Sequence, residues 1–204
     1  MVLFSSMTYV IIGLGNPGGE YAKTRHNAGR MAVERMAKLL GFPDFVLKKN
    51  AQSLLSEGII DGSKVQLVLP EVYMNLSGKV IPSFVKSKTA ARRLLIIRDE
   101  LDMPLGTMKM TYGRGSGGHK GAESIMRALK TKDFAQIKIG ISGTTLKGKL
   151  KKPADEEKVI KHVIGKFKAE EELKLKKKFD KITLAVEAFA HDDIEKALLI
   201  ANTK

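Results

Sequence analysis

The sequence predicts a single α/β domain, in which buried strands and helices alternate along the chain and pack in layers. Apolar runs rich in β-branched residues at 9–14 and 94–98 are typical of strands buried on both faces of a sheet. Apolar residues recur at helical spacing over 28–40 and over 169–190. At 204 residues the chain suits one domain with a substantial core, and two full domains are not expected.

The other elements are predicted from their boundaries. The helix at 28–40 stops where Gly41 and Pro43 follow it. Apolar runs at 52–60 and 64–70 flank a turn sequence, which predicts a hairpin. The remaining predictions are a helix at 77–86 kinked or started by Pro82, strands at 94–98, 107–111 and 136–141, a glycine-rich loop at 113–121, and helices at 122–130, 156–164 and 169–190.

Two stretches are predicted to lie outside the regular elements. Residues 143–153 are basic and weakly hydrophobic, so we expect a mobile loop there. Residues 1–8 are expected to be an N-terminal extension of the domain at 9–204. Because the N-terminus lacks the pattern of a secretory signal and no apolar run approaches the roughly 20 residues that span a bilayer, we expect a soluble, cytoplasmic protein with no membrane association.

The composition favours a polyanionic partner. There are 36 lysines and arginines against 22 aspartates and glutamates, which gives a formal net charge of +14. Such a charge favours nucleic acid, although a lysine-rich surface also serves solubility. Cysteine is absent, which excludes disulfides, thiolate catalysis and Cys-ligated metal.

The stretch at 9–29 fits two incompatible functions. Gly13, Gly15 and Gly18 have the G-x-G-x-x-G spacing of a dinucleotide-binding turn. In that fold, however, the helix begins at the turn, whereas Pro17 and a polar stretch here delay the helix to about residue 27. The acidic residue required about 20 positions later would be Glu34, in the middle of a helix. We therefore expect no nucleotide cofactor.

Polar residues at the strand ends favour a hydrolytic site instead. Asn16 follows the first strand, and its amide can donate and accept hydrogen bonds. His26, before the following helix, can accept a proton near neutral pH. Asp99 follows another strand and could orient the imidazole, with Asp102 as its rival. Loops with Asn75, which could equally be a helix cap, and Lys120 complete the set.

Long motifs then give a specific resemblance. The strings G-L-G-N-P-G-x-E-Y-x-x-T-R-H-N-x-G, Y-M-N-L-S-G, R-D-E-L-D-x-P-x-G and G-G-H-x-G occur in the order and approximate spacing of bacterial-type peptidyl-tRNA hydrolases, over about residues 9–189. The resemblance implies a monomeric α/β fold with a mixed, twisted sheet flanked by helices on both faces and no metal. It also implies hydrolysis of the ester between a peptide and the 3′ ribose of tRNA.

The resemblance also implies roles for individual residues. His26 resembles the family's general base and Asp99 its partner, while Asn16 and Asn75 resemble the residues that position substrate and water. Tyr21 and Met74 match positions that line the cleft. Lys109 and Lys138 match cations that face the tRNA acceptor arm, and this sequence adds Arg114 and the lysines at 147–152, among them Lys147 and Lys149, as further tRNA-binding candidates.

One position departs from the family pattern. Lys120 stands where the family usually has an asparagine, and Ser116 where a histidine is common. A charged lysine cannot accept a hydrogen bond, so Lys120 is expected to contact a phosphate or a developing oxyanion, and to lower the pKa of His26. The departure leaves an alternative function open, namely a catalytically silent RNA-binding protein on the same fold.

Overall fold

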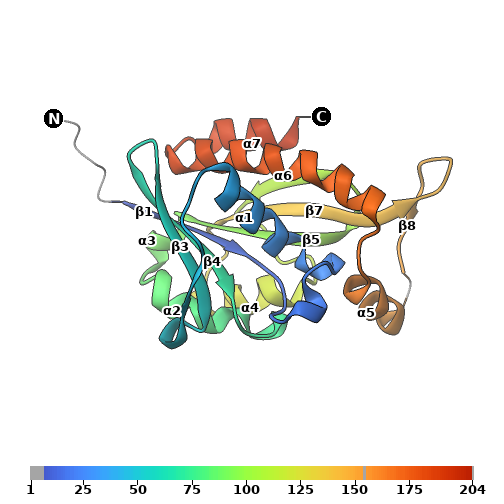
Figure 1. Ribbon diagram of the computed structural model, residues 1–204, viewed down its shortest axis with the longest axis horizontal. Helices are drawn as coiled ribbons and strands as arrows, with labels where there is room; N and C mark the ends of the chain where they lie inside the picture. Colours follow the sequence, from blue (N-terminus) through green and yellow to red (C-terminus); the bar gives the residue numbers. More distant parts are fainter. Residues whose placement is uncertain (1–6, 154, 204) are drawn as a thin grey trace.

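The computed structural model describes residues 7–153 and 155–203, which form a twisted, eight-stranded mixed sheet with helices on both faces (Figure 1). The strand order is β2-β3-β4-β1-β5-β7-β6, and β8 pairs with β7. The strands are β1 (Thr8–Gly13), β2 (Val46–Lys48), β3 (Ser53–Ile60), β4 (Ser63–Pro70), β5 (Leu94–Pro104), β6 (Met108–Tyr112), β7 (Ala135–Thr144) and β8 (Leu150–Lys151). Strands β4, β1, β5 and β7 run parallel, and the other pairs are antiparallel. The predicted fold class is confirmed.

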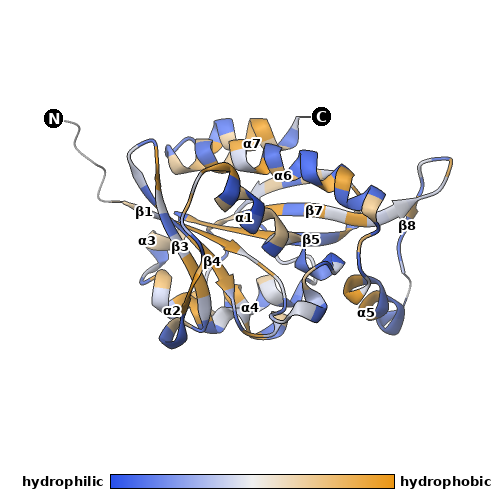
Figure 2. Ribbon diagram, viewed as in Figure 1, coloured by the Kyte–Doolittle hydropathy of each residue, from blue (hydrophilic) through white to orange (hydrophobic). Residues whose placement is uncertain are grey.

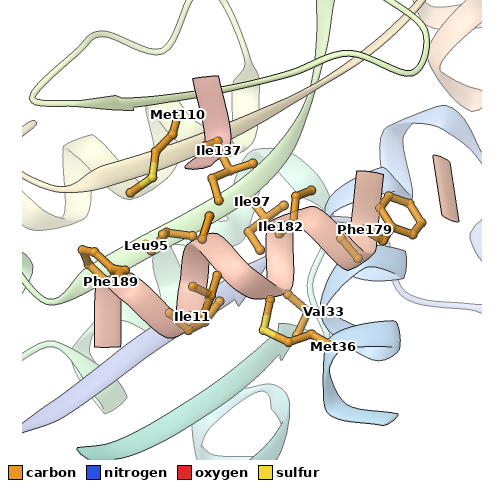
Figure 3. Close-up of a cluster of buried hydrophobic side chains, with 14 of the residues drawn as sticks. Ile11, Val33, Met36, Leu95, Ile97, Met110, Ile137, Phe179, Ile182 and Phe189 are labelled. Carbon is orange, nitrogen blue, oxygen red and sulfur yellow. The ribbon is translucent and has the colours of Figure 1, made fainter. Parts of the chain in front are cut away.

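Helices cover the sheet in two layers. One face carries α1 (Ala28–Leu39), α6 (Ala169–Ala190) and α7 (Ile194–Asn202), and the other carries α2 (Ile81–Phe84), α3 (Lys88–Ala91) and α4 (Lys120–Leu129). Because side chains alternate along a strand, Ile11 of β1 joins the core under α6 while Ile12 joins the core over α4. Figure 3 shows Phe179, Ile182 and Phe189 of α6 in the first core. Figure 2 shows apolar residues concentrated in the strands and polar residues on the outward sides of α1 and α6.

The topology opens a crevice at the carboxyl ends of the parallel strands. β1 pairs with β4 on one side and with β5 on the other, so the strand order reverses direction at β1. Such a switch in strand order is where open α/β sheets bind their ligands. α5 (Glu156–Ile164) lies at this end of the molecule, beside β8 and away from both layers (Figure 1).

Most predicted elements are present close to their expected bounds. The hairpin of β3 and β4 turns at 61–62, and the strand predicted at 107–111 is β6. The helices predicted at 156–164 and 169–190 are α5 and α6. α4 begins two residues earlier than expected, because His119 caps it by accepting a hydrogen bond from the amide of Ala122.

In the middle of the chain, the helix predicted at 77–86 starts near Pro82, as one of its alternatives stated, but its length and the end of one strand were predicted wrongly. Instead of one helix at 77–86, a 3₁₀ segment, η4 (Met74–Val80), leads into the one-turn α2, because Pro82 fits only the first turn of an α-helix. The strand predicted to end at Arg98 continues to Pro104. Its acidic residues have low strand propensity, but pairing with β7 extends through Glu100.

The ends of the predicted loops also needed correction. β7 runs to Thr144, and Thr144 pairs with Leu150, so much of the stretch expected to be a loop at 143–153 is a hairpin. Thr8 belongs to β1 rather than to an extension, and residues 1–6 of that extension lie outside the described residues. Short β2 and α3 and the C-terminal α7 were not predicted. Within 7–153 and 155–203, no helix is long and apolar enough to cross a membrane.

Candidate active site

A cleft of about 480 Å³ lies at the carboxyl ends of β1, β4 and β5. The loop after β1 contributes Asn16 and His26, and η4 contributes Met74 and Asn75. β5 contributes residues 98–102, the turn before α4 contributes residues 117–120, and α5 closes the opposite side. The fold therefore brings together four motifs that are separate in the sequence and that were predicted at strand ends. Asp99 lies within β5 rather than after its end.

A buried carboxylate joins two histidines at the base of this cleft. His26 Nδ1 lies 2.9 Å from Asp99 Oδ1, and His119 Nε2 lies 2.8 Å from the same oxygen. Asp99 and His119 are only 3% and 8% exposed. The rings of His26 and His119 lie with their centroids 5.2 Å apart. The structure thus places Asp99 where the sequence predicted the partner of His26, and adds His119 on the other side.

Hydrogen bonding determines which nitrogen carries the proton in each ring. His119 Nδ1 accepts the amide of Ala122, so Nε2 must carry the proton that it donates to Asp99. Asp99 accepts the Nδ1–H of His26 at the same oxygen. The Nε2 lone pair of neutral His26 is therefore left available, and it is the only basic nitrogen of the two rings that this network does not engage.

The charges of the three groups follow from this arrangement. Burial would raise the pKa of Asp99, but the two histidines hold it below its usual range, so the carboxylate stays ionised. Burial lowers the pKa of His26, yet the charge and hydrogen bond of Asp99 raise it more, and the net pKa is above the ordinary value. Lys120 lowers the pKa of His26 as expected, without outweighing Asp99. Burial lowers the pKa of His119, which keeps it neutral near pH 7.

Close packing of α1 against β5 positions His26. His26 lies in the 3₁₀ turn Arg25–Asn27, immediately before α1. A Cβ on Gly29 would lie 2.0 Å from the carbonyl oxygen of Ile97, so only glycine lets the first turn of α1 approach β5 at this level. Ile97 precedes Asp99 by two residues, and the approach brings His26 within reach of that carboxylate.

The loop after β1 is held by two asparagines. The side chain of Asn27 accepts the amide of Asn16 and donates to its carbonyl, and Asn27 is 1% exposed. Asn16 Oδ1 in turn accepts the amide of Met74 at 2.8 Å. This leaves the Nδ2 group of Asn16, which lines the cleft, as a further hydrogen-bond donor. A Cβ on Gly15 would lie 2.9 Å from the side chain of Asn27, so glycine at this position allows the close packing of the loop.

Arg98 is a further buried residue of the site that the sequence did not single out. It is 1% exposed, and its guanidinium donates to the carbonyls of Asp99 and Ser116 and to Glu100. The bond to Ser116 ties the loop before His119 to β5. The sequence signal that could have identified Arg98 is an arginine at the end of an otherwise apolar strand, because a buried charge must have buried partners.

The other wall of the cleft is joined to the body by exposed ion pairs. Lys120 lies 3.5 Å from Glu156 at the start of α5, and Lys152 lies 2.5 Å from Asp102. These side chains are between 46% and 80% exposed. Asp102 therefore pairs with a lysine, and the alternative that it orients His26 is wrong.

Other predicted residues lie in different places around the site. Met74 and Asn75 line the cleft, but Tyr21 is not among the lining residues.

Lys109 and Lys138 face each other across β6 and β7, and Lys138 lies 3.7 Å from Glu100. The backbone carbonyl of Arg114 accepts a hydrogen bond from Gln136 of the neighbouring β7, and its side chain is exposed. Lys147 and Lys149 are exposed in the turn between β7 and β8, and neither lines the cleft.

The two histidines and Asp99 also form the one group of three potential metal ligands in the described part of the chain, with ligand atoms within 4.8 Å of one another. A metal needs lone pairs on those atoms. Here the Nε2 of His119 carries a proton, because its Nδ1 is an acceptor. The hydrogen-bonded arrangement therefore does not fit a bound ion.

Comparison with known proteins identifies the family. The family model described as peptidyl-tRNA hydrolase matches residues 10–204. The chain belongs to the peptidyl-tRNA hydrolase family. The peptidyl-tRNA hydrolase of Thermodesulfovibrio yellowstonii is 36% identical over 95% of this chain and 98% of its own length, and that of Brevibacillus brevis is 37% identical over 95% of each. The solved structure of peptidyl-tRNA hydrolase from Acinetobacter baumannii superposes with a TM-score of 0.85 at 34% identity, covering 98% of both chains. The resemblance of the motifs to peptidyl-tRNA hydrolases is thereby confirmed.

Proposed function

We propose that this protein hydrolyses the ester between a peptide and the 3′ ribose of tRNA, which releases free tRNA. The observation that carries the proposal is the His26–Asp99–His119 network, which leaves one imidazole nitrogen free and basic in an open cleft. Membership of the peptidyl-tRNA hydrolase family supports the choice of substrate.

In the first step, His26 Nε2 removes a proton from water, and the water oxygen attacks the ester carbonyl carbon. Asp99 holds the ring in the required tautomer and stabilises the imidazolium that forms. The tetrahedral intermediate then collapses, the ester C–O bond breaks, and the imidazolium returns its proton to the leaving ribose oxygen. The products are the peptide acid and tRNA, and the balance requires no metal or cofactor.

The amides beside His26 suit the charge that develops on the carbonyl oxygen. Asn16 has its Oδ1 engaged by Met74, so its Nδ2 donates to substrate, and Asn75 offers an exposed amide at the same cleft. Donors fixed before the reaction lower the barrier because they need no reorganisation. Lys120 supplies a cation at the cleft mouth for a phosphate or for the oxyanion once it leaves Glu156.

Cations outside the cleft form the tRNA-binding surface. Lys109 and Lys138 are register partners in the adjacent strands β6 and β7, and Arg114 lies in the loop that follows β6. Lys147 and Lys149 extend this surface along the hairpin. His26, Asp99 and His119 all come from one chain, so the site needs no residue from a second copy. We propose that the enzyme acts as a monomer, in the cytoplasm where translation produces its substrate.

The proposal is tested by release of an N-acetylated amino acid from tRNA by the purified protein and by His26→Ala. We expect rapid release by the wild type and a loss of at least about 10³-fold in the variant, as for removal of a general base with its network. Equal inactivity of both proteins, with tRNA binding retained, would favour the silent RNA-binding alternative.

A further inference from the structure

The helix α5 has an apolar stripe that faces the cleft instead of the core. Val159, Ile160, Val163 and Ile164 all line the cleft, and their spacing puts them on one side of the helix. None of the residues of α5 is buried, and Ile160 and Ile164 are each 47% exposed. The apolar side of an amphipathic helix usually packs in the protein interior. Of the four stripe residues, only Val163 packs against a core cluster.

The position of the stripe indicates which molecule would contact it. The same cleft holds His26, so a molecule lying along α5 is part of the substrate that reacts there. A peptidyl-tRNA offers two chemically different parts, a polyanionic tRNA end and a peptide. The choice between them depends on the charge of this wall.

The wall formed by α5 is apolar and nearly neutral. Its first turn carries the carboxylate of Glu156, which pairs with Lys120, and Asp102 pairs with Lys152. Among the described residues, no ion pair involves Lys109 or Arg114. Lys109 lies in β6, and Arg114 lies in the loop that follows it. Phosphates therefore bind more favourably on the β6 side, and the peptide is left to contact α5.

We propose that the apolar stripe of α5 (Val159, Ile160, Val163 and Ile164) binds the side chain of the amino acid esterified to tRNA. This inference rests on the proposed function and adds a substrate preference to it. The enzyme prefers peptidyl-tRNAs whose esterified residue is large and apolar, because transfer of that side chain from water onto the stripe stabilises the bound state.

The test uses one tRNA body charged with N-acetyl-leucine, N-acetyl-glycine or N-acetyl-aspartate. For the wild type we expect kcat/KM for leucine to exceed that for glycine by about tenfold, and aspartate to be the poorest substrate. Ile160→Ser should reduce the ratio of kcat/KM for leucine to that for glycine to about twofold. Ile160 lies outside both buried clusters, so the variant is expected to fold, which its thermal denaturation curve checks.

A matched control replaces an exposed leucine elsewhere. Leu173 of α6 is 68% exposed and does not line the cleft, so Leu173→Ser should keep the wild-type ratio. Equal wild-type rates on leucine and glycine, or an unchanged ratio in Ile160→Ser, would overturn the stripe as a side-chain site while leaving the hydrolase intact. Failure of the wild type on all three substrates would overturn the proposed function, and this inference with it.

Discussion

The two walls of the cleft are built in opposite ways. On the sheet side, Asp99 and His119 are buried, and each ring nitrogen of His119 has a hydrogen-bond partner. On the α5 side, Lys120 and Glu156 meet in the solvent, and no residue of the helix is buried. Buried hydrogen-bonded groups are held in one geometry. Exposed ion pairs contribute only about 0–1 kcal/mol each to the stability of the fold, so they hold their segments weakly. The first wall is suited to chemistry that needs fixed atoms, and the second to binding that must adapt to different peptides.

The largest effect should come from the buried carboxylate. Asp99→Asn keeps the size of the side chain but replaces one oxygen by an amide that donates, so His26 loses the acceptor that selects its tautomer. We expect kcat to fall by about 10³- to 10⁴-fold with KM nearly unchanged. Single-turnover hydrolysis of N-acetyl-aminoacyl-tRNA, with circular dichroism to check the fold, measures both quantities.

The matched control is the aspartate on the other wall. Asp102 pairs with Lys152 in an exposed position, so Asp102→Asn should change kcat by less than about threefold. Similar losses in the two variants would contradict the contrast between the walls.

His119 should have the next largest effect. His119→Ala removes a donor to Asp99 and the cap of α4, so we expect a loss of about 10- to 100-fold in kcat and about 1–2 kcal/mol in stability. Asp99 would then have His26 as its sole histidine partner, so we expect the pKa of His26 to rise further. Because the base is active when deprotonated, kcat/KM rises as pH increases through the pKa of His26, and this limb should move to higher pH in the variant. An unshifted limb would limit His119 to a structural role.

The contrast between the walls also explains what the sequence could predict. Asn16, His26 and Asn75 follow strands or precede a helix in recognisable motifs, and Asp99 lies in a further motif within β5. The shared edge of parallel strands brings these positions together. His119 and Arg98 were harder to assign, because their roles depend on burial and on partners from loops far away in the sequence. The sequence shows their identity and neither their burial nor their tautomer.

The α5 wall was predicted as a helix but not as part of the cleft. Its apolar spacing is the same as that of a helix docked on a core, and only the tertiary structure shows that the stripe faces a cavity. For the same reason Lys120 could be identified as unusual while its partner, Glu156, could not. Ion pairs between separate surface segments leave no periodic signal in a sequence.

Lys120 should have a small effect, because its side chain is exposed and its ion pair with Glu156 lies in the solvent. Lys120→Asn breaks the pair with Glu156 and removes a charge that lowers the pKa of His26. We expect kcat/KM at the pH plateau to be retained or raised by a few-fold, and the rising limb of the pH profile to move slightly upward. A loss of 100-fold or more, about 2.7 kcal/mol in barrier, would show that the lysine takes part in the chemistry.

The smallest effect concerns the hairpin tip, where the contact with tRNA would be purely electrostatic. Replacing Lys147 and Lys149 together by glutamine should leave kcat unchanged and reduce the slope of log affinity against log salt by about 0.7 to 0.9 for each lost phosphate contact. Lys176 and Lys177 on α6 are equally exposed, so the same double replacement there provides a control for net charge. Equal slopes in the two double variants would mean that net charge, and not the hairpin, sets the salt dependence, and the adaptable side of the enzyme would then be confined to the α5 wall.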